Sequence, residues 1–315
     1  MTVREYRKGE SQGVADLWRR NPTLGGPLIG INPDAVAKVL VQTERPLARF
    51  ALGLARLFHR PIFMVIIVDL DGHVMGTTLV TFSPEAIYIS SVVVDAAVRR
   101  QGHAKAMLQA AEALGRKFHR PYAVLDVVAQ NDAAIRLYDS WGYRPLREAG
   151  WLSRPFGPEA PPLPPVSGTT RIRPLQPTDG AALAAMDNAL MSAEVRAIQP
   201  RHAGDFRPSS FDRSVLMTEA DAWVAEVDGQ PAGFLRASVN RAIEAGNLSS
   251  PLFRGDAPEM VMQDTIVTAL RWLEARNVPR VVTEMADHQR HAKPVFDRLG
   301  FTEALQLHTM VHRLA

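Results

Sequence analysis

The sequence of 315 residues contains no cysteine. Neither a disulfide nor a thiolate metal site can therefore form. Long apolar runs are also missing, because the most apolar stretch, residues 47–68, is interrupted by three arginines, a histidine and a proline. Charges at that density exclude a membrane span. The first ten residues, MTVREYRKGE, lack the apolar core of a secretory signal, so we expect a cytoplasmic protein without a membrane partner.

The chain carries only a small excess of positive charge. The net charge is +3, and residues 1–150 carry 19 Lys and Arg against 14 Asp and Glu, whereas the remainder carries 17 against 19. A mildly basic first half suits a phosphorylated small ligand. The excess is too scattered to predict a nucleic-acid partner. A basic surface that binds nothing would explain the same numbers.

Several catalytic motifs are absent. The sequence has no His-Glu-x-x-His, no Gly-x-Ser-x-Gly, no Gly-x-Gly-x-x-Gly and no Gly-Lys-Ser/Thr, which leaves zinc hydrolysis, serine hydrolysis and the common nucleotide loops without support. Asp287, His288 and His291 lie close together. No further ligand with metal-site spacing accompanies them, so we expect no metal and interpret them as a polar helix start.

A proline-rich segment divides the chain into two similar halves. Six prolines fall between Pro155 and Pro165, a density that excludes a helix or a central strand. Asp71-Gly72 recurs as Asp228-Gly229, and Tyr138-Asp139-x-x-Gly142-Tyr143 recurs as Phe296-Asp297-x-x-Gly300-Phe301, at offsets of 157 and 158 residues. These repeats indicate a duplicated domain. We predict domains at 1–152 and 169–315 and a linker at 153–168.

The first half has the pattern of an α/β layer structure. Strand patterns lie on both sides of Asp71-Gly72, a hairpin signal. Apolar residues with the helical period follow Gly102, and a buried strand over 122–128 precedes a short helix that ends at Gly142. Two further helices are expected, one from Pro33 and one that begins at Pro46 and ends before Pro61. The apolar face of the second of these predicts core packing, or else an acceptor lid or a partner surface.

The most informative stretch is VVVDAAVRRQGHA, residues 92–104, in which a β-branched strand enters a basic turn and a helix starts at Gly102-x-Ala104. The first backbone N–H groups of a helix have no intrahelical partner, and the helix dipole favours negative charge there. Gly102 and Ala104 leave room for a phosphate beside Arg99 and Arg100. Taken alone, the stretch is also compatible with an ordinary helix start beside a solvated basic turn.

Two ordered signatures in the first half resemble the GNAT superfamily of N-acetyltransferases. Residues 99–104, RRQGHA, are similar to that family's pyrophosphate loop, and its second signature resembles Leu125-Asp126-Val127, Asn131, Ala134-Ile135, Leu137-Tyr138 and Gly142-Tyr143. The resemblance covers about 150 residues. It implies two tandem GNAT-type domains, each a mixed, mostly antiparallel sheet flanked by helices, with acetyl-CoA as co-substrate.

The resemblance also implies roles for individual residues. Backbone amides of Gln101, Gly102, His103, Ala104 and Lys105 would hold the CoA pyrophosphate beside Arg99 and Arg100, and Val92, Val94 and Asn131 would line the pantetheine arm. Tyr138 would protonate the departing thiolate; a core aromatic that anchors the short helix is the alternative. Asp126 would serve as base, although a buried Asp satisfied by backbone amides, with an amine proton relayed through water, fits equally.

The second half departs from the pattern at the ligand positions. At an offset of 157, Asp256-Ala257-Pro258-Glu259 replaces Arg99-Arg100-Gln101-Gly102, so that Glu259 takes the place of the glycine, and Phe296 replaces Tyr138. Carboxylates at a helix start repel a phosphate. We therefore expect a structural second domain, or one that shapes the acceptor pocket.

The predicted function is transfer of an acetyl group from acetyl-CoA to a primary amine of a small molecule or peptide, by direct attack in a ternary complex. Acceptor loops are expected at Pro22–Arg60. Two alternatives are a non-catalytic acyl-CoA-binding regulator and a tandem acetyltransferase of the mycothiol-synthase type, in which the C-terminal copy is active. The sequence leaves the acceptor, the acyl chain and the oligomeric state open.

Overall fold

The computed structural model describes residues 2–22, 33–59, 61–158, 160–207, 218–240 and 245–314. Within these ranges the chain divides into two compact units. The first unit contains the described chain up to Leu146 together with the segment that begins at Leu307, and the second contains residues 147–306. No helix in the described ranges is long and apolar enough to cross a membrane.

The first unit is a sheet in the order β1-β2-β3-β4-β5-β13. Its β4–β5 pair is parallel, and the other pairs are antiparallel. The strands are β1 (Thr2–Glu5), β2 (Phe63–Leu70), β3 (His73–Phe82), β4 (Ala86–Val94), β5 (Tyr122–Val128) and β13 (Thr302–Arg313). The helices are α1 (Ser11–Arg20), α2 (Pro33–Thr43), α3 (Pro46–Leu57), α4 (His103–Lys117) and α5 (Asp132–Ser140).

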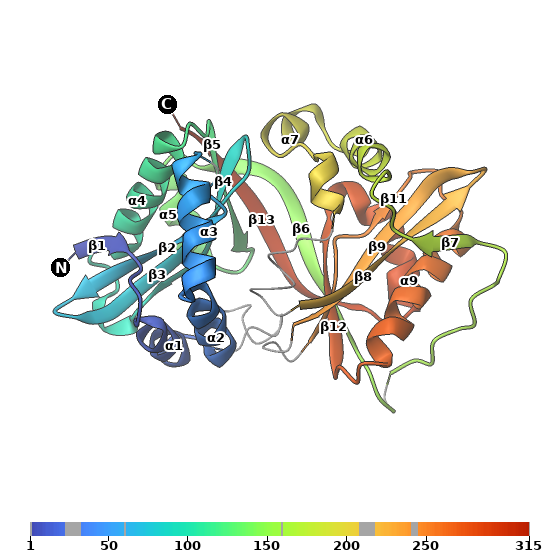
Figure 1. The fold of residues 1–315 in the computed structure, drawn as a ribbon, viewed down its shortest axis with the longest axis horizontal. Helices are drawn as coiled ribbons and strands as arrows, with labels where there is room; N and C mark the ends of the chain where they lie inside the picture. Colours follow the sequence, from blue (N-terminus) through green and yellow to red (C-terminus); the bar gives the residue numbers. More distant parts are fainter. Residues whose placement is uncertain are drawn as a thin grey trace. The chain divides into compact units, whose positions relative to one another are not determined.

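Alternate residues of β2 separate the two faces of this sheet. Ile66 and Val68 pack in one cluster with Met107 and Leu108 of α4. Ile67 lies in the other cluster, with Val14, Leu17 and Trp18 of α1 and Leu40 of α2. Because neighbouring strand residues point to opposite faces, α4 covers one face and α1 the other (Figure 1).

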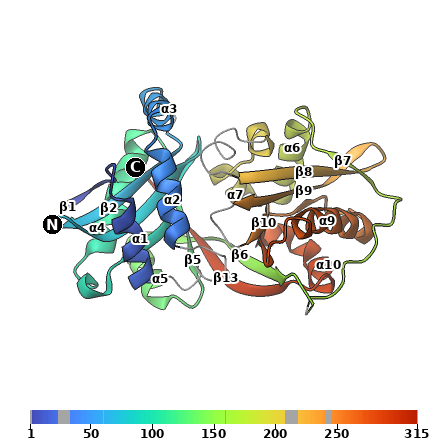
Figure 2. The same ribbon diagram turned by 60° about the horizontal axis from the view of Figure 1, so that its bottom comes forward.

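The second unit repeats this architecture. Its sheet has the order β7-β8-β9-β10-β12-β6, with the β10–β12 pair parallel, and β11 adds to β9. The strands are β6 (Arg144–Pro155), β7 (Arg171–Pro174), β8 (Thr218–Val227), β9 (Gln230–Asn240), β10 (Gly246–Leu248), β11 (Leu252–Phe253) and β12 (Arg280–Ala286). The helices are α6 (Gly180–Leu190), α7 (Ala193–Ile198), α9 (Glu259–Glu274), which packs on β9 (Figure 2), and α10 (Lys293–Arg298).

The two halves exchange their last strands. β13, from the end of the chain, pairs with β5 over Leu307–Arg313, and β6 pairs with β12 over Ala149–Pro155 (Figure 1). The boundary expected after residue 152 therefore falls inside β6. Duplication gives both last strands a similar pattern, so each fits the sheet of the other half, as in domain swapping.

The proline-rich segment packs on the second unit. The Arg154 side chain, 1% exposed, donates to the carbonyls of Leu299 (2.7 Å), Pro155 (3.0 Å) and Pro161 (2.5 Å). Asp264 of α9 accepts a hydrogen bond from the Ser167 backbone N–H at 3.0 Å. A predicted linker is thus fastened at both of its ends.

The repeated Asp-Gly turns have the geometry that their residues favour. φ is +50° at Asp71 and +84° at Gly72, and +52° at Asp228 and +73° at Gly229. Two consecutive positive φ values define the turn that matches the twist of a hairpin. The β2–β3 hairpin agrees with its prediction, and β8–β9 follows from the repeat.

Candidate active site

A bulge and a divergence of strands define the candidate site. The register of β3 with β4 shifts between Thr77 and Leu79, and Ser91 on the opposite strand has φ +56°. The described parallel ladder of β4 with β5 stops at Ile89–Leu125, although the strands continue to Val94 and Val128. A gap between the two strands therefore exposes backbone groups that no ladder uses.

Val94 directs its backbone groups into this gap. Asp95 N–H donates to the Met75 carbonyl at 2.8 Å. In an antiparallel ladder the next residue along points its N–H and C=O to the other side, which for Val94 is the side of β5. Its carbonyl accepts from Arg99 Nε at 3.1 Å. Its N–H remains the donor that faces the gap.

The loop before α4 has a backbone geometry that favours anions. Arg100 has φ +63°, and Gly102, with φ +84°, is the N-cap of α4, which begins at His103. Positive φ beside helical φ makes a concave arrangement of N–H groups, which favours anions. A Cβ built on Gly102 would meet nothing within 4 Å, so the loop is open in front of the helix.

His103 adds an independent indication of a ligand. The residue is 6% exposed, and its Nδ1 atom is buried without a hydrogen-bond partner among the described residues. Buried polar atoms without a partner are rare in folded proteins. A ligand at the start of α4 would supply one.

The same loop is tied to the end of α1. Asp95 accepts from Ala97 N–H at 3.0 Å and from Arg20 at 3.0 Å. Asn21 accepts from Ala96 N–H at 2.9 Å and from Arg99 at 3.1 Å. The Ala97 N–H, together with Arg20 and Asn21, outweighs burial and lowers the pKa of Asp95. Arg99 therefore stabilises the loop through these hydrogen bonds, and its positive charge remains next to the loop.

Tyr138 lies in the core of the first unit on α5. It is 6% exposed, packs in the cluster of α4, and its ring centroid is 6.0 Å from that of Tyr143. Burial raises its pKa to about 12. No described residue forms a hydrogen bond with its hydroxyl. The side chain is therefore a neutral donor whose proton is not engaged.

The Asp126 side chain lies on the face of β5 opposite to the cluster that contains Tyr138. Leu125 and Val127 pack in the same cluster as Tyr138, so the residue between them points to the face of α1. Its carboxylate accepts from the hydroxyls of Tyr88, on β4, and Thr309, on β13. The structure thus satisfies Asp126 with side-chain hydroxyls rather than backbone amides, and it shows no contact between Asp126 and Tyr138 among the described residues.

The other predicted ligands lie on the elements that flank the gap. Asn131 is the N-cap of α5, and its side chain accepts from Ala134 N–H at 3.2 Å. Lys105 Nζ lies 4.6 Å from the ring centroid of Trp141. Val92 and Val94 pack against the cluster that contains Tyr138, and Asn131 follows the end of β5.

Comparison with known proteins identifies the unit that contains this gap. Residues 37–143 match the model of the acetyltransferase (GNAT) family. Over these residues the first unit matches the GNAT acetyltransferase family, and the match covers about a third of the chain. No curated protein matches the chain in sequence.

The whole chain has the fold of tandem GNAT proteins. A tandem GNAT protein from the clavulanic acid biosynthesis pathway is 16% identical, with a TM-score of 0.68 over 100% of this chain and 98% of its own. A GCN5-related N-acetyltransferase from Sphaerobacter thermophilus is also 16% identical, with a TM-score of 0.67 over 99% of this chain and 95% of its own. At this identity the likeness establishes the fold.

The second GNAT-like unit corrects the predicted alignment by one residue. α9 begins at Glu259 and has Pro258 as its N-cap, where α4 begins at His103 after Gly102. Pro258, and not Glu259, therefore takes the place of the glycine. Proline has no N–H, so this position offers no backbone donor. Glu259 pairs with Arg298 at 2.6 Å.

In the second unit, side chains form hydrogen bonds between the elements that correspond to those beside the gap. Gln289 follows β12 as Asn131 follows β5, and its Oε1 accepts from Phe253 N–H of β11 at 3.2 Å. Asp187, of α6, contacts His288 Nε2 at 3.0 Å and accepts from Arg201 at 3.0 Å. Phe296 is fully buried at the position of Tyr138.

No group of three or more His, Asp or Glu in the described ranges could hold a metal ion. His288 is held by Asp187, and Asp287 and His288 lie in a 3₁₀ turn, Asp287–Ala292, ahead of α10. The part of the expected acceptor loops that comprises residues 23–32 and Arg60 lies outside the described residues.

Sequence reasoning missed the partners of the site residues. Tyr88 and Thr309 hold Asp126 across two strand pairings, and Thr309 comes from the other half of the chain. Asn21 ties the loop to α1 from 75 residues away. No local pattern marks any of these three positions; only the alternation of β4 could have placed Tyr88 beside Asp126.

Proposed function

We propose that the chain is an N-acetyltransferase that transfers the acetyl group of acetyl-CoA to a primary amine by direct attack in a ternary complex. One observation carries the proposal. The gap between β4 and β5 opens beside the phosphate-loop geometry of α4, in a unit of the acetyltransferase family. That arrangement suits a ligand with a diphosphate at one end and an extended arm at the other.

The residues of the first unit would hold acetyl-CoA in two parts. N–H groups of Gln101–Lys105 and the buried Nδ1 of His103 would receive the pyrophosphate, with Arg100 adding charge. The pantetheine arm would lie in the gap, between Val92 and Val94 on one side and Asn131 on the other.

The gap would then direct the chemistry. The neutral amine attacks the thioester carbon, and the negative oxygen of the tetrahedral intermediate receives a hydrogen bond from Val94 N–H. When the intermediate collapses, the carbon–sulfur bond breaks and Tyr138 donates its proton to the thiolate. Tyr138 suits this step because its raised pKa keeps the hydroxyl protonated.

Asp126 would take the proton that the amine loses. A carboxylate has about four lone-pair sites, so the two hydroxyls of Tyr88 and Thr309 orient the group and leave acceptor capacity. The side chain lies on the face of α1, from which an acceptor would approach. We propose a water between the amine and this carboxylate.

Calorimetric titration with acetyl-CoA tests the proposal. We expect one site per chain, abolished by Gly102→Glu, because a carboxylate at the start of α4 repels the pyrophosphate. Gly72→Glu is the matched control, since Gly72 has the same φ of +84° and equally open surroundings. Two sites would contradict the inactive second unit, and no binding would overturn the proposal.

A further inference from the structure

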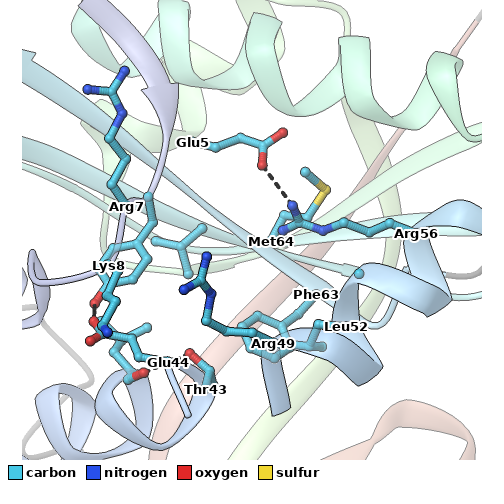
Figure 3. A pocket seen from close by; sticks show the side chains of 14 residues that line it. Glu5, Arg7, Lys8, Thr43, Glu44, Arg49, Leu52, Arg56, Phe63 and Met64 are labelled. Atoms are coloured by element: carbon cyan, nitrogen blue, oxygen red, sulfur yellow. Dashed lines mark hydrogen bonds and ion pairs between the residues drawn. The ribbon is translucent and has the colours of Figure 1, made fainter. Parts of the chain in front are cut away.

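A second cavity of the first unit is unused by the proposed cofactor site. It has a volume of about 450 Å³, which lies in the range of small-molecule sites. The walls come from the end of β1, the end of α2, one side of α3 and the start of β2 (Figure 3). Its floor is apolar and includes Leu40, Leu52, Met64 and Val65.

The acidic side chains of this cavity already have partners. Glu5 pairs with Arg56 at 3.0 Å. Glu44 accepts from the Tyr6 hydroxyl and from Gly9 N–H at 3.1 Å. Burial, with Glu44 beside it, raises the pKa of Tyr6, so its hydroxyl remains a donor to that carboxylate.

A guanidinium in the same cavity has no partner. Arg49 makes no ion pair or hydrogen bond through its side chain with any described residue, and Figure 3 shows its guanidinium pointing from α3 toward the part of the cavity between Lys8 and Met64. Arg7 and Lys8 add positive charge at the wall. Residues 23–32, outside the described ranges, contain no Asp or Glu that could pair with Arg49.

The cavity and the candidate base lie on one face of the sheet. Val65 of the cavity wall pairs with Leu79 of β3, and Leu79 pairs with Ser90 of β4. Ser90 lies beside Asp126, one step beyond the Ile89–Leu125 pair. Two strand spacings separate Val65 from Ser90, about 10 Å, which is about three residues of extended peptide.

We infer that this cavity binds the anionic end of the amine acceptor, so that the substrate is a primary amine carrying a carboxylate or a phosphate-type group some 10 Å away. The inference rests on the proposed acetyltransferase function. Arg49 supplies the charged fork for the acid, and the apolar floor holds the connecting chain.

Two arms of one experiment test this inference. The first measures binding of heptanoate and hexylphosphonate by calorimetry, to the wild type and to Arg49→Gln. The second compares acetyl transfer to 7-aminoheptanoate, 6-aminohexylphosphonate and heptylamine, because an extended chain of this length separates the amine from the acid by about 10 Å. Arg45→Gln is the matched control, because Arg45 precedes α3 and does not line the cavity.

We expect the wild type to bind at least one acid and to acetylate its amino form with a kcat/KM at least tenfold above that of heptylamine. Arg49→Gln should lose both the binding and the preference, and keep its affinity for acetyl-CoA. The acid that binds more tightly shows whether the site prefers a carboxylate or a phosphate-type group. Binding of neither acid, or equal binding by Arg49→Gln, overturns the inference even if acetyl transfer occurs. Binding that needs Arg49 without any transfer supports the anion site and overturns the acetyltransferase proposal.

Discussion

Thr309 Oγ1 donates a hydrogen bond of 2.5 Å to Asp126 Oδ1. The two residues face each other directly in the antiparallel pairing of β13 with β5, and Thr309 is fully buried. β13 is the last strand of the chain, whereas β5 belongs to the first half. The second half of the sequence therefore completes the environment of the proposed base in the first unit.

Thr309→Val should destabilise the protein and disturb Asp126. The substitution keeps the shape of the side chain and removes a buried donor to a carboxylate, which costs about 1–3 kcal/mol in the free energy of unfolding. Urea unfolding of the two proteins measures this cost. Thr302→Val is the control on the same strand, because the Thr302 hydroxyl is exposed and its bond to the Ser153 carbonyl is long, at 3.4 Å. Equal effects of the two substitutions would contradict a special role for the Thr309 contact.

Tyr138→Phe should lower kcat by about 10²-fold or more, the usual contribution of a general acid, with little change in the affinity for acetyl-CoA. Thiol release in steady state and calorimetry measure the two quantities. Tyr143→Phe is the matched control, since Tyr143 is a buried tyrosine of the same cluster. A protein that only binds acyl-CoA would show no difference between the two variants.

The pH dependence gives a separate test of Tyr138. With a pKa of about 12, its hydroxyl stays protonated below about pH 11, whereas an ordinary tyrosine with a pKa of about 10 would lose its proton earlier. We expect kcat at saturating substrates to stay level between pH 8 and 10. A fall of kcat around pH 9 would exclude Tyr138 as the acid in this environment.

Local patterns predicted the elements of the first unit but not the pairing of its last strand. The hairpin at Asp71-Gly72, the helices from Pro33 and Pro46 and the loop at Gly102 depend on turn, proline and glycine chemistry, which acts within a few residues. The exchange of β6 with β13 depends on which of these two similar strands pairs with β5. The alternation of apolar and polar residues in either strand would fit that pairing, so the sequence does not distinguish them. The proposed role of Arg49 could not be predicted from the sequence either, because a lone arginine on a helix is usually solvated.

Arg154→Met should destabilise the second unit by about 3 kcal/mol. The arginine is buried and donates to three backbone carbonyls, which would lose their partners, while methionine fills much of the volume. Burial lowers the pKa of Arg154, although Glu274 opposes the change. Limited proteolysis should then cut the segment 156–166 sooner than in the wild type. Arg144→Met, an exposed change in the same strand, is the control, and equal proteolysis of the two variants would show that Arg154 does not hold the segment.

His288 should make the stability of the protein depend on pH near neutrality. Burial opposes its protonation, but the hydrogen bond to Asp187 and the carboxylate of Asp287, 3.5 Å from Nδ1, outweigh burial and the repulsion from Arg147, so its pKa is raised. A raised folded-state pKa gives stability that is fully present below the unfolded value of about 6.5 and is lost as pH rises through the folded value. The pKa of Asp187 is lowered, because His288 and Arg201 outweigh its burial, so this carboxylate stays charged throughout that range.

His288→Asn removes this pair, and we expect a loss of about 1.5–3 kcal/mol at pH 6, the value of a hydrogen bond to a charged group. The difference between the two proteins should shrink as pH rises to 9, because the wild type then loses the imidazolium as well. Urea unfolding followed by tryptophan fluorescence at several pH values measures both. His291→Asn, an exposed change in the same 3₁₀ turn, should leave the profile unchanged. Parallel stability curves for the wild type and His288→Asn would show that the Asp187–His288 contact carries no charge, since only a protonated imidazole makes the difference depend on pH.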